Sequence, residues 1–287
     1  MTVLVFGHTG QVASELRRQF DVVALDRNMA DLINPSACAE IIRSYQPEAV
    51  INAAAYTAVD RAEEGEAIAT DINGQAPAAM AQACAEIACP FVHISTDYVF
   101  DGSGTTPRRP DEMTSPCNAY GRTKLAGEIA IRNSGTVYAI LRTSWVFSAF
   151  GANFVKTMVR LSETKSELKI VNDQIGGPTP ADSIAKACMT IAQTLRSKPE
   201  LTGTYHFASS PETSWAGFAR EIFERTGRSV SVTGIPTRDY PTPARRPLNS
   251  RLDCEATYQA FEISPPDWRE GLDRTLTELG ILKGSKQ

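Results

Sequence analysis

The sequence has no surplus of positive charge. Its 287 residues include 29 lysines and arginines against 33 aspartates and glutamates, which gives a formal net charge of −4. A chain of this charge has no global field that would attract nucleic acid or an anionic membrane. We therefore expect no nucleic-acid partner, and any anionic ligand must be held by local groups.

Long apolar runs are also missing. No segment of the sequence approaches the ~20 consecutive apolar residues that a membrane span needs, so we expect none. Residues 1–7 read at once as a strand, without the basic start, apolar core and cleavage site of a signal peptide. These features predict a cytoplasmic protein with no membrane partner.

Cysteine and histidine are few and scattered. The six cysteines contain no C-x-x-C pair, and a chain of this size needs no disulfide staples, so we interpret them as reduced thiols. The three histidines, His8, His93 and His206, have no His or Cys neighbour at metal-ligand spacing. We predict no metal site.

The chain does contain a regular alternation of short apolar runs with stretches of helical length. Strand-like runs lie at 3–6, 22–25, 49–54, 91–95 and 138–142, with helical stretches that include 68–88 and 119–132. Parallel strands need long crossovers, usually helices, so this order indicates a sheet covered on both faces. The predicted fold class is α/β, a doubly wound parallel sheet of the Rossmann type.

The alternation loosens in the second half of the chain. A strand at 168–171, a helix at 182–195 and a strand at 205–208 follow, and the proline-rich tract 236–247 indicates a functional loop or a domain crossing. We predict a dinucleotide-binding domain over 1–146 and a smaller C-terminal α/β substrate-binding domain, mainly over 147–287. Segments near 168–190 and 230–250 are expected to return to the first domain.

A glycine-rich turn follows the first strand. In the segment Gly7-His8-Thr9-Gly10-Gln11-Val12-Ala13, a tight turn leads into a helix, whose N-terminal N–H groups and dipole favour a pyrophosphate. Gly7 permits the turn, Gly10 permits close approach, and Ala13 permits close packing. An ordinary glycine turn is the alternative, but the acidic Asp26 at the end of the second strand favours a dinucleotide site.

Asp26 and its neighbour Arg27 leave the cofactor open. An acid about 20 residues after the glycine turn can bind the ribose hydroxyls of NADH, whereas a guanidinium can bind the 2′-phosphate of NADPH. The third strand ends at Asn52-Ala53-Ala54-Ala55. These small side chains either leave room for adenine or ribose, or pack tightly at the strand end.

Tyr120 and Lys124 stand four residues apart in a predicted helix, which places them on one face. A nearby ammonium favours the phenolate and brings the pKa of a tyrosine toward the working range of a proton donor. Alone, such a pair is usually an exposed helix pair. Thr96 and Asp97 favour a catalytic pair instead, because they end a central strand, where doubly wound sheets bind ligands.

These segments together resemble the extended short-chain dehydrogenase/reductase superfamily over nearly the whole chain. Similar stretches include 7–12, 52–60, 95–102, 120–124, 141–147, 173–179 and 246–250. The resemblance implies that Thr96, Tyr120 and Lys124 carry catalysis. It implies that the cofactor is held by Gly7, Thr9, Gly10, Gln11, Val12, Asp26, Asp31, Leu32, Ala53, Ala54, Ala55, Tyr120 and Lys124.

The same resemblance implies a dTDP-sugar substrate whose C4 keto group is reduced by NADPH or NADH, and a possible homodimer. Substrate contacts would come from Val59, Thr96, Asp97, Trp145 and Arg246. Trp145 is either an apolar wall for the deoxysugar or a core aromatic, and Arg246 either pairs with the diphosphate or is solvated.

The nearest rivals within the superfamily are dehydratases and epimerases. Similar dehydratases carry a Thr-Asp-Glu run, whereas Tyr98 occupies the place of that glutamate here. An epimerase would keep its nicotinamide tightly bound, and a non-catalytic regulatory subunit would show no turnover. The complete set of Thr96, Tyr120 and Lys124 argues against the regulatory subunit, whereas an epimerase shares the Tyr and Lys and stays an alternative.

Overall fold

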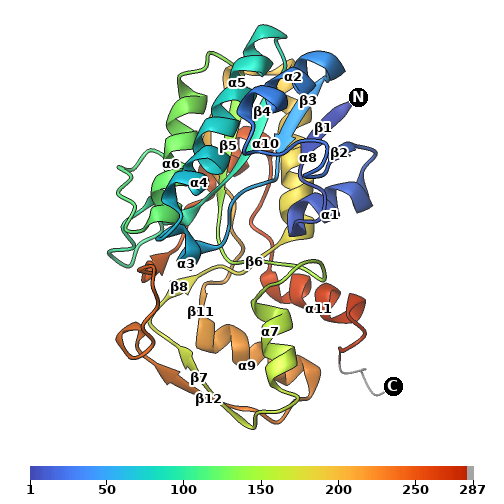
Figure 1. The fold of residues 1–287 in the computed structure, drawn as a ribbon. Coiled ribbons are helices and arrows are strands. Elements are labelled where there is room, and N and C mark those ends of the chain that lie inside the picture. The colour runs from blue at the N-terminus through green and yellow to red at the C-terminus, as the bar shows by residue number, and fades with distance from the viewer. Residues whose placement is uncertain (283–287) are drawn as a thin grey trace.

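The computed structural model describes residues 1–282. A six-stranded parallel sheet forms the larger part of the fold (Figure 1). Its strands are β1 (Val3–Phe6), β2 (Val23–Leu25), β3 (Ala49–Asn52), β4 (Phe91–Thr96), β5 (Tyr138–Thr143) and β10 (Gly203–His206), in the order β10-β5-β4-β3-β1-β2. The strand order reverses at β1, because β2 and β3 lie on opposite sides of it. Such a reversal leaves a crevice at the carboxyl ends of β1 and β3.

Helices cover both faces of the sheet. Along β1, Val3 and Val5 face a core shared with α1 (Gln11–Gln19), α8 (Ala181–Ser197) and α10 (Glu255–Phe261). Leu4 and Phe6 face the opposite core, which contains residues of α2 (Pro35–Tyr45), α5 (Ala76–Glu86) and α6 (Ala119–Arg132). The period-two alternation of a strand thus feeds two apolar cores. The predicted doubly wound sheet is confirmed.

The helical stretch expected at 68–88 is interrupted by a wide turn. It consists of α4 (Glu66–Thr70), the π-helical turn η1 (Asp71–Gln75) and α5, and it follows the short helix α3 (Val59–Ala62). Within the wide turn, the Asn73 side chain accepts a hydrogen bond from the Tyr56 N–H and donates one to the Thr123 hydroxyl. The turn therefore ties α6 to the loop that leaves β3.

A smaller lobe lies below the carboxyl ends of the large sheet in Figure 1. Its helices are α7 (Phe154–Leu161), α9 (Trp215–Thr226) and α11 (Trp268–Glu278), and β7 (Glu167–Val171) pairs in parallel with β12 (Ser231–Ile235). Phe147, Phe218 and Trp268 belong to its apolar core.

Short strands lie between this lobe and the large sheet. They are β11 (Thr213–Ser214), β8 (Ile175–Gly176) and β13 (Asn249–Ser250) in one sheet, and β6 (Val146–Phe147) with β9 (Thr179–Pro180) in another. The 3₁₀ turns are η2 (Asp97–Val99), η3 (Pro199–Leu201) and η4 (Thr237–Asp239).

The segments that rejoin the large sheet agree only in part with those expected near 168–190 and 230–250, because α8 begins inside the first range. Strands β7 and β12 pair with each other in the smaller lobe, whereas α8, β10 and α10 cover or extend the large sheet. Exposure alternates along most of β7, with Glu167 and Lys169 exposed. Such a strand suits a sheet with one solvated face, whereas a parallel sheet covered by helices buries both faces. The division near residue 146 stays a prediction.

The six cysteines are free thiols, as expected. Within residues 1–282, none of the helices is both long and apolar enough to cross a membrane. The same residues contain no group of three or more His, Cys, Asp or Glu side chains that could hold a metal ion.

Candidate active site

The glycine turn occupies the point where the strand order reverses. Gly7 has φ of 117°, and its N–H donates to the Leu25 carbonyl of β2. A Cβ atom on Gly7 would lie 3.2 Å from Ala13 Cβ and 3.3 Å from the Ala53 carbonyl carbon. Gly10 then precedes α1 and has no side chain to cap the first N–H groups of that helix. The turn fits the close approach of a dinucleotide pyrophosphate.

The acidic residues after β2 take part in turns. Asp26 Oδ1 accepts hydrogen bonds from the N–H groups of Asn28 and Met29, at 2.8 and 2.9 Å. Arg27 is exposed and forms an ion pair with Asp31 at 3.3 Å. Asp26 and Arg27, the two residues that could distinguish NADH from NADPH, thus both lie in the turn that follows β2. Leu32 is buried in the core beneath them.

The segment after β3 reaches the same crevice. The Ala53 N–H donates to the Phe6 carbonyl of β1, and the Ala54 N–H donates to Asn52 Oδ1. Ala53, Ala54 and Ala55 are each half-buried, so their small side chains are neither sealed in the core nor fully solvated. This placement favours the first of the two interpretations, room for a flat ligand.

The structure brings Tyr120 and Thr96 together. Tyr120 lies in the first turn of α6, which Asn118 caps by accepting from the Gly121 N–H at 2.8 Å. Burial raises the pKa of Tyr120 above its usual value, and it outweighs the opposing effect of the nearby Thr96 side chain. Tyr98 packs edge-on against Tyr120, with ring centroids 5.6 Å apart.

Thr96 ends β4 and is itself buried. Its hydroxyl lies 3.1 Å from Asp97 Oδ1 and accepts from the Tyr98 N–H. Burial raises the pKa of Asp97 to about 7, and the nearby Ser250 and Thr96 side chains act in the opposite direction. Within residues 1–282, Asp97 Oδ2 has no hydrogen-bond partner. A buried carboxylate oxygen with spare acceptor capacity suits a ligand hydroxyl.

Lys124 lies one turn after Tyr120 on α6, as the spacing predicted, but its contacts are with β4. Its Nζ atom donates to the Ile94 carbonyl at 2.8 Å and lies 3.0 Å from His93 Nε2. Burial lowers the pKa of Lys124 to about 8, and Glu128 acts in the opposite direction. The expectation that Lys124 brings the pKa of Tyr120 toward neutrality is not met, because burial dominates at the phenol.

A buried ion pair supports this part of α6. Glu128 accepts hydrogen bonds from Arg142 Nε and Nη2 of β5, at 2.9 and 2.7 Å, and from the Ser95 hydroxyl at 2.6 Å. Both charged side chains are at most 1% exposed. Sequence reasoning missed this pair. A glutamate four residues after Lys124 on the same helix was the one available signal.

The aromatic residue expected at the substrate side is paired with a second one. Trp145 has φ of 51°, a conformation unusual for a large side chain, and its ring stacks on Trp215 with centroids 3.7 Å apart. Trp215 Nε1 in turn donates to Gln174 Oε1 at 3.1 Å. Trp215 was not foreseen, because 70 residues of chain separate the two tryptophans.

Asp60, the residue after Val59, links Arg246 to the start of α3. Arg246 Nη2 forms an ion pair with Asp60 Oδ2 at 2.8 Å, and Val59 precedes Asp60 at the start of α3. The guanidinium is therefore neither free nor simply solvated. The Arg246 side chain is 18% exposed, so part of the guanidinium is accessible to a ligand.

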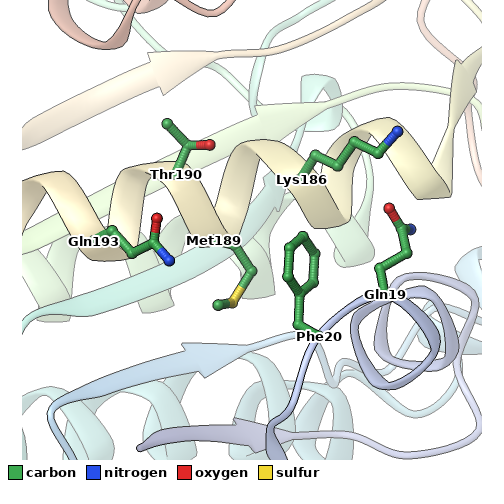
Figure 2. A pocket seen from close by; sticks show the side chains of 6 residues that line it. All are labelled: Gln19, Phe20, Lys186, Met189, Thr190 and Gln193. Carbon is green, nitrogen blue, oxygen red and sulfur yellow. The ribbon is translucent and has the colours of Figure 1, made fainter. Parts of the chain in front are cut away.

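A separate hollow of about 530 Å³ lies between the end of α1 and α8 (Figure 2). Figure 2 shows the Phe20 ring directed toward α8, with Gln19, Lys186, Met189, Thr190 and Gln193 around it. Helix α1 begins at the crevice, so its far end lies near the opposite edge of the sheet. The hollow is not part of the candidate active site.

A Rossmann sheet with a glycine turn at its reversal point, Thr96 at the end of β4, and Tyr120 and Lys124 on α6 is the arrangement of an oxidoreductase of the extended short-chain dehydrogenase/reductase type. The family model described as RmlD substrate binding domain matches residues 1–281. The chain belongs to this family of dTDP-4-dehydrorhamnose reductases.

Individual relatives agree along the whole chain. A dTDP-4-dehydrorhamnose reductase of Sinorhizobium fredii is 43% identical, covering 99% of each chain. The crystal structure of such a reductase from Clostridium acetobutylicum has a TM-score of 0.91 and 35% identity, covering 98% of this chain and 100% of the other. A Bacillus anthracis reductase in complex with NADP has a TM-score of 0.89 and 32% identity, covering 96% and 99%.

Proposed function

We propose that this protein reduces the C4 keto group of dTDP-4-dehydro-6-deoxy-L-mannose with NADPH or NADH to give dTDP-L-rhamnose. The observation that supports the proposal is the position of Thr96 at the carboxyl end of β4 and of Tyr120 in the first turn of α6, which packs against that strand and η2. Relatives 43% identical over the full length carry the name of this reductase, and one solved relative binds NADP.

In this proposal the reduced nicotinamide, when bound, supplies the hydride. Tyr120 holds the proton that the developing C4 alkoxide takes up, and its raised pKa keeps that proton in place at neutral pH. The Thr96 hydroxyl donates to the same oxygen and stabilises its charge. Lys124 orients the nicotinamide ribose from the next turn of α6.

The cofactor would lie along the turn and the strand ends that form the crevice. Gly7, Gly10 and the N-terminus of α1 would hold the pyrophosphate, together with Thr9, Gln11 and Val12. Asp26, Asp31 and Leu32 would hold the adenosine end, and the small residues Ala53, Ala54 and Ala55 would line the rest.

The substrate would lie between the sheet and the smaller lobe. We assign Asp97 to a sugar hydroxyl, the Trp145 ring to the apolar face of the deoxysugar, and Arg246 to the diphosphate, next to Val59. Residues 1–146 would then hold the cofactor and also supply Val59, Asp97 and Trp145 to the substrate, while the predicted substrate-binding domain, mainly 147–287, would supply Arg246. A homodimer stays a prediction.

The test is Tyr120→Phe, with the exposed Tyr45→Phe as the matched control. Loss of a general acid should reduce turnover by about 10²- to 10⁴-fold and leave cofactor affinity nearly unchanged. The assay generates the substrate with an upstream epimerase and follows the absorbance of the reduced nicotinamide.

Unchanged turnover of Tyr120→Phe would refute the assignment. Wild-type protein without substrate-dependent oxidation would favour a non-catalytic module. A nicotinamide retained through gel filtration would favour an epimerase. Parallel assays with dTDP- and UDP-linked sugars test the nucleotide preference.

A further inference from the structure

The N-terminal cap of α6 joins two segments that lie far apart in the sequence. Asn118 precedes the first residue of α6 and is 1% exposed. Its Oδ1 atom accepts a hydrogen bond from the Gly121 N–H, and its Nδ2 atom donates one to the Arg245 carbonyl, both at 2.8 Å. Arg245 lies 127 residues further along the chain, in the proline-rich tract 236–247. One buried side chain therefore connects the helix that carries Tyr120 to this tract.

The two neighbours fix the orientation of the Asn118 amide. A backbone N–H can only donate and a backbone carbonyl can only accept, so the oxygen faces Gly121 and the NH₂ group faces Arg245. The oxygen satisfies one of the free N–H groups in the first turn of α6, the turn that contains Tyr120. The nitrogen holds the tract. A substitution can therefore remove the bond to the tract and keep the capping bond.

The tract is also bound by α3. Asp60 Oδ1 accepts from the Ala244 N–H at 3.1 Å, and Asp60 Oδ2 pairs with Arg246 Nη2 at 2.8 Å. The residues on both sides of Arg245 are thus bound to α3, while the Arg245 carbonyl is bound to the cap of α6. The backbone that carries the Arg246 guanidinium is therefore fixed relative to the first turn of α6.

The first turn of α6 is held by other segments as well. Glu63, the residue after α3, accepts with Oε1 from the Ala119 N–H at 2.8 Å. A Cβ atom on Gly121 would lie 2.2 Å from the Tyr98 carbonyl oxygen, so this turn packs directly against η2. Tyr120 lies between Ala119 and Gly121. Its position therefore depends on η2, α3 and the proline-rich tract together.

We propose that Asn118 is a positioning residue that sets the place of Tyr120 relative to the substrate diphosphate bound by Arg246. The inference rests on the proposed function, in which Tyr120 is the proton donor and Arg246 contacts the diphosphate. In a sugar nucleotide the pyranose ring separates the diphosphate at C1 from the keto group at C4, so the two protein groups must match that separation. Binding energy from the diphosphate can then be used at C4, and misplacing Tyr120 should reduce turnover more than binding.

The first test is Asn118→Ser. Serine caps a helix about as well as asparagine, but its shorter side chain does not extend to the Arg245 carbonyl at the same time. We expect kcat to fall by about 10- to 100-fold, because a misplacement of about 1 Å has an effect of this order. The Kd of dTDP alone, measured by calorimetry, should stay nearly unchanged, because Arg246 keeps its contact with Asp60.

The matched control is Asn34→Ser. Asn34 caps α2 in the same way, by accepting from the Ala37 N–H at 3.1 Å, and it is exposed. Its kcat should equal that of the wild type. An unchanged kcat in Asn118→Ser would overturn the proposal, and so would an equal loss in Asn34→Ser. A dTDP affinity that falls as far as kcat would also overturn it, because the diphosphate site itself would then be disturbed.

A second variant, Asn118→Asp, keeps the volume of the side chain and the cap, and loses only the donor to the Arg245 carbonyl. It decides the question if the serine variant does not fold. The new charge can weaken the binding of a diphosphate, so kcat is measured at saturating substrate. We expect a loss at least as large as in Asn118→Ser, and a wild-type kcat contradicts the proposal.

A double-mutant cycle with Arg246→Met measures the link itself. If Asn118 sets Tyr120 relative to the bound diphosphate, the substitution of Asn118 should matter less once the Arg246 guanidinium is gone. The kcat/KM of the double variant should then exceed the value expected from two independent losses by about 5-fold or more. Independent losses contradict the proposal. If Tyr120→Phe abolishes turnover while the two losses are independent, the proposed function stands and this inference fails.

Discussion

Replacing Lys124 by methionine should remove a pH-dependent part of the stability of the fold. Lys124 is 1% exposed, and its pKa is lowered by burial from 10.5 to about 8. This difference, at about 1.4 kcal/mol for each pKa unit, corresponds to about 3 kcal/mol. Between these two pKa values the unfolded chain binds more protons than the folded one. The free energy of unfolding of the wild-type protein should therefore rise with pH through this window.

Urea unfolding of both proteins at pH 6.5 and pH 10 measures the effect. The buried tyrosines and cysteines also titrate toward high pH, so the quantity of interest is the difference between wild type and Lys124→Met. We expect the wild type to gain about 2 to 3 kcal/mol relative to the variant over this range. Lys186→Met, at an exposed position of α8, is the matched control and should behave as the wild type. An equal pH dependence in wild type and Lys124→Met would refute the reasoning.

Two further predictions concern charged pairs. Glu128→Gln should lower the free energy of unfolding by about 3 to 5 kcal/mol, because it leaves the buried Arg142 uncompensated, whereas Glu66→Gln, which breaks the exposed pair with Arg122, should cost at most about 1 kcal/mol. Equal losses in urea unfolding would contradict this contrast. Arg27→Ala should raise KM for NADPH by about 10- to 100-fold and leave KM for NADH unchanged, since a guanidinium bond to phosphate is charge-assisted. Parallel titrations of the two cofactors check it, and an equal change in both would exclude Arg27 from cofactor choice.

Much of the sheet could be predicted because its signals are local. The strand at 91–95 and the helix at 119–132 became β4 and α6 with bounds that differ by at most one residue. Apolar periodicity and turn residues act over a few positions, so they are readable from one sequence. The position of Thr96 at the carboxyl end of a central strand followed from the predicted topology, whereas its partnership with Tyr120 came from the family resemblance.

Pairings between distant segments could not be predicted in this way. Nothing local to β7 indicates that β12, more than 60 residues away, is its partner in the smaller lobe. The stack of Trp145 on Trp215 has the same origin. His93 looked like an isolated histidine, because its contacts depend on which side chains of β3 and α6 lie beside it. These features depend on packing, which a list of residues does not contain.

The buried polar groups at the ends of β3 and β4 differ in how completely they are hydrogen-bonded. His93, Asn52 and Lys124 satisfy one another, and each would be costly if left alone. Asp97 differs, since one of its oxygens has no partner within residues 1–282 and burial raises its pKa to about 7. A fold under selection for stability alone would pair or remove that oxygen. The group is best explained if a sugar hydroxyl completes its hydrogen bonds, so the cost of burial is offset when substrate binds next to Thr96.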